Sequence, residues 1–499
     1  MNKNLIVSTN SGMVEGIHQN GMNMWLGIPF AKPPVGELRF KRARKPEPWD
    51  GVLKCQEMGP GPIQFAAGSL KMMTEQKYRK NEDCLYLNIK APENARMAPV
   101  FVWIYGGANS IGEASAPEYL TDAFPRDGVI GVSFNYRVGP LGFYDFSALD
   151  HRFESNCAAS DMIAAMQWIH ENIAAFGGDP ENVTICGESA GGTAVYTLLA
   201  APTAKGTFQK AIAQSGLAGN VTNPQTHRLN NGLFLKKLRL NEGDISELLT
   251  MDVERMIDAA GYVLAHNNVE YPGILVSGPV IDELIPWTPW EAIENGNADD
   301  VTCMFGTCRD EGNLFYALGM TPKSWKEIQR MLELNDIPEK LEDLKKLYHG
   351  MSEKKAMQSI GRDRMFWVDY MKCTLAKAER GTVYSFRFDF EPFLARIAGL
   401  HATHGMDICC GLDTWSGKMY LPNLLTSKKR LQEIHKVMHG AFVDFCKTGI
   451  PDLHMDEKWK PYIPEKPYTF IFNDICSHTN STNRINYELW KDIELYNQK

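Results

Sequence analysis

The feature of this sequence that most restricts its fold is a glycine-rich turn, GESAGG at 187–192, between two apolar segments. The apolar run 183–186 precedes the turn and predicts a buried strand, and the apolar segment 193–201 follows it and predicts a helix. Small residues around Ser189 allow a bend so tight that it lifts the serine hydroxyl above the sheet. An ordinary glycine-rich turn would carry the same pattern, but the flanking strand and helix favour Ser189 as a nucleophile.

Apolar strands and helices alternate along the chain on both sides of this turn. A helix is predicted over 161–176, where apolar residues recur at helical spacing until Gly177-Gly178. Strands are predicted at 85–90, 100–105, 129–134, 183–186, 211–214, 301–306, 383–388 and 469–472. The alternation predicts an α/β fold with a mostly parallel central sheet and helices on both faces.

The domain organisation predicted from the sequence is simple. No linker is obvious enough to divide the 499 residues, so we predict one catalytic domain over 1–499. Helical patterns dominate from about 224 to 380, apart from the strand at 301–306, and predict a mainly helical insertion that shapes the pocket.

Composition excludes several classes of protein. The net charge of −8, from 52 basic and 60 acidic residues, argues against a nucleic-acid binder. No segment approaches the ~20 consecutive apolar residues of a membrane-spanning helix. The first residues lack the apolar region of a secretory signal, and the 11 cysteines are scattered, so we expect reduced thiols and a cytoplasmic protein. The oligomeric state cannot be predicted from these features.

A serine nucleophile needs a base, and the base needs an acid that orients it. In a fold of this kind the chain order is serine, acid, histidine. The acid candidates that follow apolar strands downstream of Ser189 are Asp282, Asp310 and Glu311. His401 and His404 lie in a loop further along the chain. Other downstream histidines, such as His349, His435 and His439, fall in helical patterns. Order and loop position favour His401 or His404 as the base.

A third requirement is a group of donors for an oxyanion. The strand at 100–105 ends in Tyr105-Gly-Gly-Ala108, where small residues let backbone N–H groups approach a substrate oxygen. The N–H of Ala190, next after the nucleophile, would complete the donor group.

Long strings in the sequence resemble those of the type-B carboxylesterases, and they cover nearly the whole chain. They are, in order, GIPFAKPPVGELRF, EDCLYLNI, VFVWIYGGA, NYRVGPLGF, FGGDPENVTICGESAGG, AIAQSG, GTCRDEGNLF and HGMDICCGL. The resemblance implies an α/β-hydrolase fold and a serine esterase that hydrolyses small carboxylic esters through an acyl-enzyme. It implies no metal and no organic cofactor.

The resemblance also implies roles for individual residues. It makes Ser189 the nucleophile and Glu311, rather than Asp310, the acid. His404 matches the base because it stands three residues before Asp407, a spacing that His401 lacks. It further implies an oxyanion hole made of the backbone amides of Gly107, Ala108 and Ala190. Glu188 and Ser215 would support the histidine. Two structural ion pairs are also implied, Arg137–Asp161 and Arg39–Glu82.

Three departures from the family pattern lead to expectations of their own. Tyr105 and Asn109 replace the usual histidine and a common aromatic residue, and we expect Asn109 to make the pocket mouth more polar. Cys84 lacks the upstream cysteine with which secreted members pair it, which puts that disulfide in doubt. Asp161 is retained, but the glutamine that usually follows it is not.

Two other functions stay open. One is a non-catalytic, cholinesterase-like binding protein, and the other is hydrolysis of amides or thioesters by the same residues. Five aromatic or apolar residues could line the pocket or equally pack in the core, namely Phe315, Met320, Trp325, Phe390 and Phe393.

Overall fold

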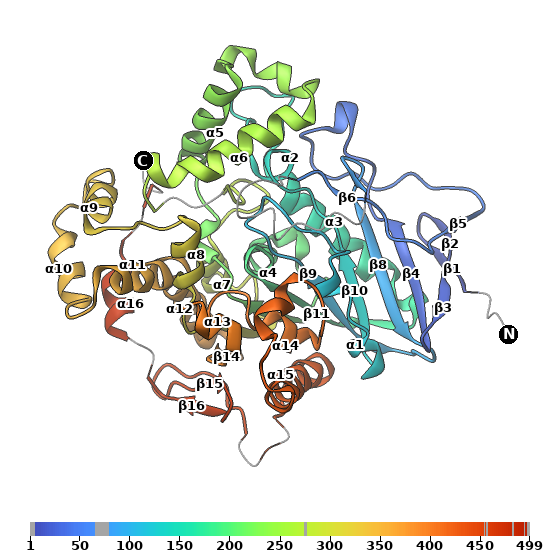
Figure 1. The fold of residues 1–499 in the computed structure, drawn as a ribbon. Coiled ribbons are helices and arrows are strands. Elements are labelled where there is room, and N and C mark those ends of the chain that lie inside the picture. The colour runs from blue at the N-terminus through green and yellow to red at the C-terminus, as the bar shows by residue number, and fades with distance from the viewer. Residues whose placement is uncertain are drawn as a thin grey trace.

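The computed structural model describes residues 5–64, 79–273, 277–453, 455, 458–481, 484–493 and 495–496. Their centre is an eleven-stranded sheet (Figure 1). In spatial order its strands are β16 (Ser477–Thr479), β15 (Thr469–Phe472), β14 (Val383–Phe388), β13 (Thr302–Cys308), β12 (Lys210–Gln214), β11 (Gly178–Glu188), β9 (Ala98–Ile104), β10 (Ile130–Phe134), β8 (Tyr86–Pro92), β4 (Met22–Pro29) and β3 (Ile17–Gln19).

The strands from β15 to β10 run parallel, and the strands at the two ends pair antiparallel. This arrangement confirms the mostly parallel sheet predicted from the apolar runs. Each strand predicted from the sequence corresponds to a strand of the sheet, although several begin or end a few residues away from the predicted bounds.

Alternate residues of the sheet face two separate helical layers, as the two-residue repeat of a strand requires. In β9, Val100 and Val102 pack in the core cluster that includes α3 (Cys157–Asn172), α4 (Ala190–Ala200) and α12 (Val368–Arg380). Phe101 and Trp103 pack in the cluster that includes α1 (Ala123–Arg126), α14 (Ile408–Leu412) and α15 (Lys428–Thr448). The prediction of helices on both faces is therefore confirmed.

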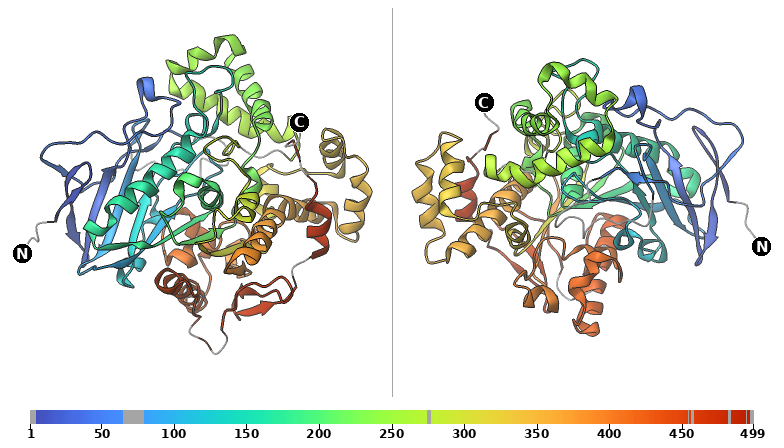
Figure 2. Two further views of the ribbon diagram at one scale, coloured as in Figure 1. Left: turned by 180° about the vertical axis from the view of Figure 1, so that it is seen from behind. Right: turned by 45° about the horizontal axis from the view of Figure 1, so that its top comes forward.

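The mainly helical range 224–380 is not one continuous insertion. Strand β13 lies inside it and pairs between β12 and β14, because its apolar residues are buried on both sides. Helix α12 packs on β13 and β14 of the sheet, and helix α7 (Pro289–Glu294) packs on α12 and α4 in the same core cluster. Two helical groups remain outside the sheet layers, as Figure 2 shows from two further sides.

The first group consists of α5 (Pro224–Leu238), η7 (Glu242–Leu249) and α6 (Val253–Glu270), which pack on α2 (Pro140–Phe143) and nearby aromatic residues. The second group follows β13 and contains α8 (Gly312–Leu318), α9 (Trp325–Glu333), α10 (Lys340–Leu347), α11 (Glu353–Arg362), the π-helical turn η8 (Asp363–Trp367) and α16 (Arg484–Trp490).

The remaining elements are short. The N-terminal residues form a small sheet of β1 (Ile6–Thr9), β2 (Gly12–Glu15) and β5 (Val52–Lys54), and β6 (Gly61–Pro62) pairs with β7 (Lys80–Asn81). The other short helices are η1 (Gly36–Leu38), η3 (Pro117–Tyr119), η4 (Ile173–Phe176), η5 (Pro202–Ala204), η6 (Ala218–Asn220), α13 (Phe393–Ile397) and η9 (Lys418–Asn423).

Two expected ion pairs are present. Arg137 Nη2 lies 2.7 Å from Asp161 Oδ1, and both side chains are buried. Arg39 Nε donates to Glu82 Oε2 at 2.8 Å. All eleven cysteines are thiols, and all except Cys476 are buried.

The described residues lack both a membrane-spanning helix and a metal-binding cluster. No helix in them is long and apolar enough to cross a membrane. The same residues contain no group of His, Cys, Asp and Glu side chains that could hold a metal ion.

Candidate active site

Ser189 occupies a strained turn between β11 and α4. Its φ of 60° and ψ of −123° lie in a region that non-glycine residues rarely adopt. A Cβ on Gly191 would lie 2.1 Å from the carbonyl oxygen of Ile104, and one on Gly187 would lie 2.4 Å from that of Gly191. Only glycine fits these positions, so the predicted tight turn is present and its geometry depends on direct backbone contact.

His404 and Glu311 form a buried pair. The Nδ1 atom of His404 lies 2.6 Å from Oε2 of Glu311, which sits between β13 and α8. The other carboxylate oxygen of Glu311 accepts a hydrogen bond from the backbone N–H of Cys308 at 2.7 Å. Because the Glu311 carboxylate accepts a hydrogen bond from Nδ1, that nitrogen carries a proton. The Nε2 atom of the same ring points away from Glu311.

Two aromatic rings hold the imidazole in place. The rings of Phe315 and Phe366 each lie with their centroid 4.9 Å from that of His404. Phe366 belongs to the π-helical turn η8, an element that is rare and often found at functional sites. Sequence reasoning missed Phe366, since it lies within a helical pattern that carries no motif.

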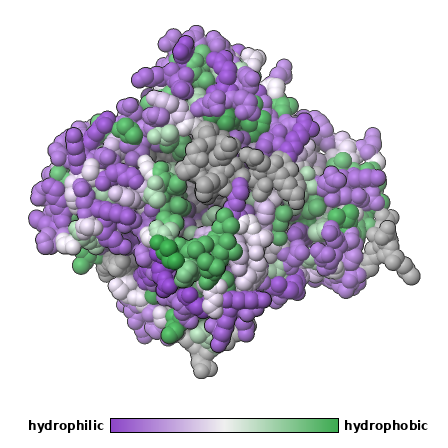
Figure 3. Space-filling view, viewed as in Figure 1, coloured by the Kyte–Doolittle hydropathy of each residue, from purple (hydrophilic) through white to green (hydrophobic). Residues whose placement is uncertain are grey.

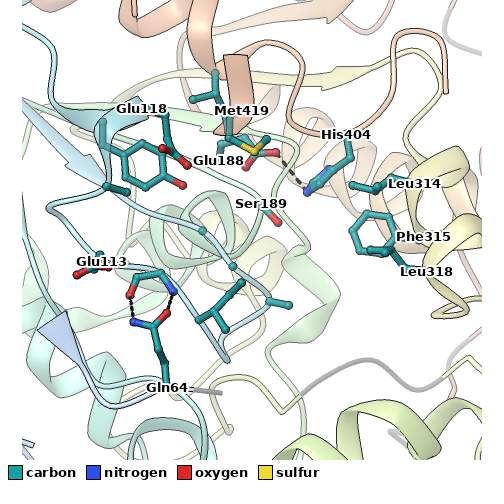
Figure 4. Close-up of a pocket in the computed structure, with 18 of the residues that line it drawn as sticks. Gln64, Glu113, Glu118, Glu188, Ser189, Leu314, Phe315, Leu318, His404 and Met419 are labelled. Atoms are coloured by element: carbon teal, nitrogen blue, oxygen red, sulfur yellow. Dashed lines mark hydrogen bonds and ion pairs between the residues drawn. The ribbon is translucent and has the colours of Figure 1, made fainter. Parts of the chain in front are cut away.

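The Nε2 atom of His404 lies 3.2 Å from Oε1 of Glu188, as the dashed line in Figure 4 shows. No hydrogen bond joins Nε2 to the hydroxyl of Ser189, although both residues line one pocket. Burial disfavours a charged imidazole, but the carboxylates of Glu188 and Glu311 outweigh burial and raise the pKa of His404. The pKa of Glu188 is also raised, in this case by burial, and the nearby His404 opposes that shift.

Asp407 and Ser215 lie at the buried side of the site. Asp407 accepts a hydrogen bond from Gln214 Nε2 at 2.9 Å, and burial raises the pKa of its carboxyl to about 6. The backbone N–H of Ser215 donates to Gly306 at 2.8 Å and joins β12 to β13. No hydrogen bond between Ser215 and His404 is found among the described residues, so the expected role of Ser215 stays a prediction.

Backbone amides converge on the pocket beside Ser189. Gly107 and Ala108 have positive φ values of 127° and 53° and line the same pocket as the serine. Within the described part of the chain, neither amide donates a hydrogen bond. Ala190 is the first residue of α4, where an amide has no acceptor inside the helix. Three backbone donors are therefore available near the serine.

The expectation for Asn109 is wrong. Its side chain is buried, does not line the pocket, and donates to the carbonyl oxygen of Ser277 at 3.1 Å. The left-handed backbone at Ala108 and Asn109 turns this side chain away from the pocket mouth. Its contribution is to hold the loop rather than to make the mouth polar.

The pocket has a volume of about 820 Å³ including its open mouth. Its polar side chains include Gln64, whose amide exchanges two hydrogen bonds with the backbone of Gly112 (Figure 4). They also include Glu113, which pairs with Lys80. The apolar lining includes Ile111, Leu314, Phe315, Leu318, Met320, Ile408 and Met419.

Two of the five residues that the sequence suggested for the pocket lining are found there. Phe315 and Met320 line the pocket, as predicted. Trp325 and Phe390 pack instead in two core clusters away from the pocket. Phe393 lies on α13, where its ring contacts Arg396. Gln64, Glu113, Glu118 and Met419 were missed, because no motif surrounds them and they come from loops distant in sequence.

The chain matches the model of the Carboxylesterase family over residues 3–490. It belongs to this family. The chain is 34% identical to para-nitrobenzyl esterase of Bacillus subtilis (strain 168) over 476 residues, which cover 94% of each chain. It is 30% identical to phenmedipham hydrolase of Pseudarthrobacter oxydans, covering 94% of this chain and 95% of the relative.

Solved structures agree with this assignment. A structure of a PNB esterase superposes with a TM-score of 0.87 and 32% identity, covering 98% of this chain and 99% of that chain. The fold is therefore the α/β-hydrolase fold, and the chain is a carboxylic ester hydrolase.

Proposed function

We propose that this carboxylesterase works as a serine hydrolase with Ser189, His404 and Glu311 as its catalytic triad. The observation that carries the proposal is the 2.6 Å contact between His404 Nδ1 and Glu311, on the far side of an imidazole that shares a pocket with Ser189. An acid, a base and a nucleophile in this arrangement suit acyl transfer.

In the proposed reaction, His404 Nε2 takes the proton of the Ser189 hydroxyl while the oxygen attacks the ester carbonyl carbon. The amides of Gly107, Ala108 and Ala190 donate to the resulting oxyanion. The tetrahedral intermediate collapses, the C–O bond to the alcohol breaks, and the alkoxide takes the proton from Nε2. Water then repeats the sequence on the acyl-enzyme, which releases the acid and restores Ser189.

In the structure, His404 Nε2 contacts Glu188 and not the hydroxyl of Ser189. With a carboxylate at each ring nitrogen, His404 is stabilised as an imidazolium and cannot accept a proton. The proposal therefore requires Nε2 to lose its proton and to move from Glu188 to the hydroxyl of Ser189 before catalysis.

Hydrolysis of para-nitrophenyl esters from acetate to octanoate, by the wild type and Ser189→Ala in parallel, tests this proposal. We expect the variant to lose nearly all activity, and the chain-length optimum to report the size of the acyl pocket. Labelling by a fluorophosphonate, present in the wild type and absent in the variant, would identify the nucleophile. Activity that survives Ser189→Ala would contradict the triad.

The same assay separates the remaining alternatives. Matched amide and thioester substrates measure which leaving groups the site accepts besides those of esters. The alternative of a non-catalytic binding protein is wrong, because the chain is a carboxylic ester hydrolase. The cytoplasmic location stays a prediction, which cell fractionation with an antibody to the chain would test.

A further inference from the structure

A second cavity lies where the second helical group meets α7 and α12. Its volume is about 780 Å³ including its open mouth, and its lining comes from η6, the segment that leads into α5, α7, η8, α12 and α16. The outer surface of the same helical group, over α9 and α10, is mainly hydrophilic, as Figure 3 shows, which is typical of a layer that faces water. The described residues that line this cavity include none of those that line the catalytic pocket, so the two cavities are separate.

One face of the cavity carries two cationic side chains. Arg364 on η8 and Lys372 on α12 are eight residues apart, with Val368 midway between them, and all three line the cavity. Residues four apart lie on one face of a helix, so the two cations share a side of this segment. The Nζ atom of Lys372 lies 4.6 Å from the ring centroid of Trp290, which also lines the cavity.

Neither cation has an acceptor at hydrogen-bond distance among the described residues. The Nε atom of Arg364 is buried without a partner, and its Nη1 atom lies 3.8 Å from Oδ2 of Asp369, which is too far for a hydrogen bond. The ammonium of Lys372 contacts the indole face of Trp290 instead of a carboxylate. A guanidinium and an ammonium only donate, so this face of the cavity offers hydrogen bonds that no described group accepts.

The two carboxylates of the lining differ from the cations, because both already accept hydrogen bonds. Asp369 Oδ2 accepts from the backbone N–H of Gly219 at 2.9 Å. Glu291 Oε2 accepts from the backbone N–H and the hydroxyl of Thr288, at 2.9 and 2.7 Å, and so caps the start of α7. The formal charges of the two cations and the two carboxylates cancel, but the donors still lack an acceptor, which a bound anion would supply.

Much of the remaining lining is apolar. Trp490 is buried, and its Nε1 atom donates to the hydroxyl of Tyr348 at 2.8 Å, so the one polar atom of this indole is already occupied. The other apolar residues of the lining are Val221, Ile281, Val368 and Ile493. Unused donors beside an apolar wall suit an organic anion, whose carboxylate would lie at the cations and whose hydrocarbon part would lie against the indoles.

We propose that this cavity is a second ligand site, which binds an organic carboxylate. Hydrolysis of an ester releases a carboxylic acid, so the activity of this enzyme itself produces ligands of this class. The inference goes beyond the proposed triad and does not depend on it, because the described linings of the two cavities have no residue in common.

Isothermal titration calorimetry of the full-length protein with benzoate tests the proposal. We expect the wild type to bind benzoate, and to bind benzamide, an uncharged molecule of similar shape, about tenfold more weakly or less, because benzamide cannot form a charge-assisted pair with a guanidinium. Arg364→Met and Lys372→Met should each weaken benzoate binding about tenfold or more, since each removes a charged donor.

A matched control variant lies in the first helical group. Lys237 Nζ lies 4.8 Å from the ring centroid of Tyr262, much as Lys372 lies over Trp290, but Lys237 and Tyr262 are not among the residues that line the cavity. Lys237→Met should therefore bind benzoate as the wild type does. Urea unfolding shows whether each variant is folded, and Lys372→Met, which replaces a partly exposed side chain, carries the test if Arg364→Met does not fold.

Each outcome decides for or against the site. Weaker benzoate binding in the folded cavity variants, with the Lys237→Met control unchanged, supports the proposal. A wild type that does not bind benzoate would overturn it. Cavity variants that bind benzoate as tightly as the wild type would place the benzoate elsewhere, for example in the catalytic pocket, and would also overturn it. Equal affinities for benzamide and benzoate would show that the site does not recognise the negative charge, which is a third contradicting result.

Discussion

The two ring nitrogens of His404 each face a glutamate, and the two glutamates are expected to act in opposite directions. Glu311 at Nδ1 orients the ring and stabilises the imidazolium that forms during the reaction. Glu188 at Nε2 occupies the side of the ring that must accept the serine proton. A charge-removing variant of each glutamate separates these two effects.

The variant Glu311→Gln should lower kcat by about 10³–10⁴-fold, because the amide no longer fixes the tautomer or balances the imidazolium charge. Steady-state kinetics measure this, and KM should change little. The neighbouring Asp310 pairs instead with Arg309, so Asp310→Asn is a matched control that should keep most activity. A larger loss in Asp310→Asn than in Glu311→Gln would mean that the wrong acid has been assigned.

The variant Glu188→Gln should move the acid limb of kcat/KM to lower pH. The neutral imidazole is the base, so activity rises as pH increases through the pKa of His404. Burial lowers this pKa, but Glu188 and Glu311 raise it overall, so removing the Glu188 charge must lower it, by about 1–3 pH units. A profile of kcat/KM against pH measures the midpoint of this acid limb.

Glu391 provides the control for this measurement, since it lies beside the half-exposed His401 and pairs with Arg309. The acid limb of Glu391→Gln should coincide with that of the wild type. An unchanged limb in Glu188→Gln would show that Glu188 does not influence the base.

At the scale of elements, the turn between β11 and α4 depends on close backbone contacts at its glycines. Gly191→Ala would place a methyl group 2.1 Å from the carbonyl oxygen of Ile104, so we expect the free energy of unfolding to fall by at least about 3 kcal/mol. Urea unfolding followed by tryptophan fluorescence measures this.

A second glycine provides the control. Gly232 lies in α5, and a Cβ there would meet nothing within 4 Å. Gly232→Ala should leave activity unchanged and raise stability by about 0.5–1 kcal/mol, as alanine is the better helix former. Equal losses of stability in the two variants would contradict the argument from backbone contact.

The π-helical turn η8 shows how an element can serve the site from a distance. It follows α11 in the second helical group and places Phe366 against the imidazole of His404. The ring orientation of the proposed base therefore depends on a helical layer that lies outside the central sheet.

At the scale of the whole molecule, the Arg137–Asp161 pair links the segment after β10 to α3. Asp161→Ala would leave a buried guanidinium without its carboxylate, and we expect it to lower the free energy of unfolding by about 3–5 kcal/mol. Urea unfolding measures this loss. Arg137→Met combined with Asp161→Leu should recover most of it, since no buried charge remains.

The exposed Lys345–Glu342 pair is the comparison, and Glu342→Ala should cost about 0.5 kcal/mol or less. A small loss in Asp161→Ala would show that Arg137 finds other partners. The same unfolding curves test our proposal that residues 1–499 form one domain, which predicts a single transition.

Three features could be predicted from the residues of the chain: the fold class, the strand–turn–helix around Ser189 and the order of the acid and histidine candidates. These features are local, since apolar runs and glycine turns report the conformation of the residues that carry them. The residues alone left His401 and His404 open, and only the resemblance to a family favoured His404.

Which side chains meet became clear only from the folded structure. It brought His404 against Glu311 and left His401 half-exposed beside Glu391, and it placed Glu188 at Nε2 rather than leaving that nitrogen to the serine. It also turned Asn109 toward Ser277 and Phe366 toward His404. These contacts join segments that are distant in sequence. No local pattern can specify them, because each depends on how the whole core packs.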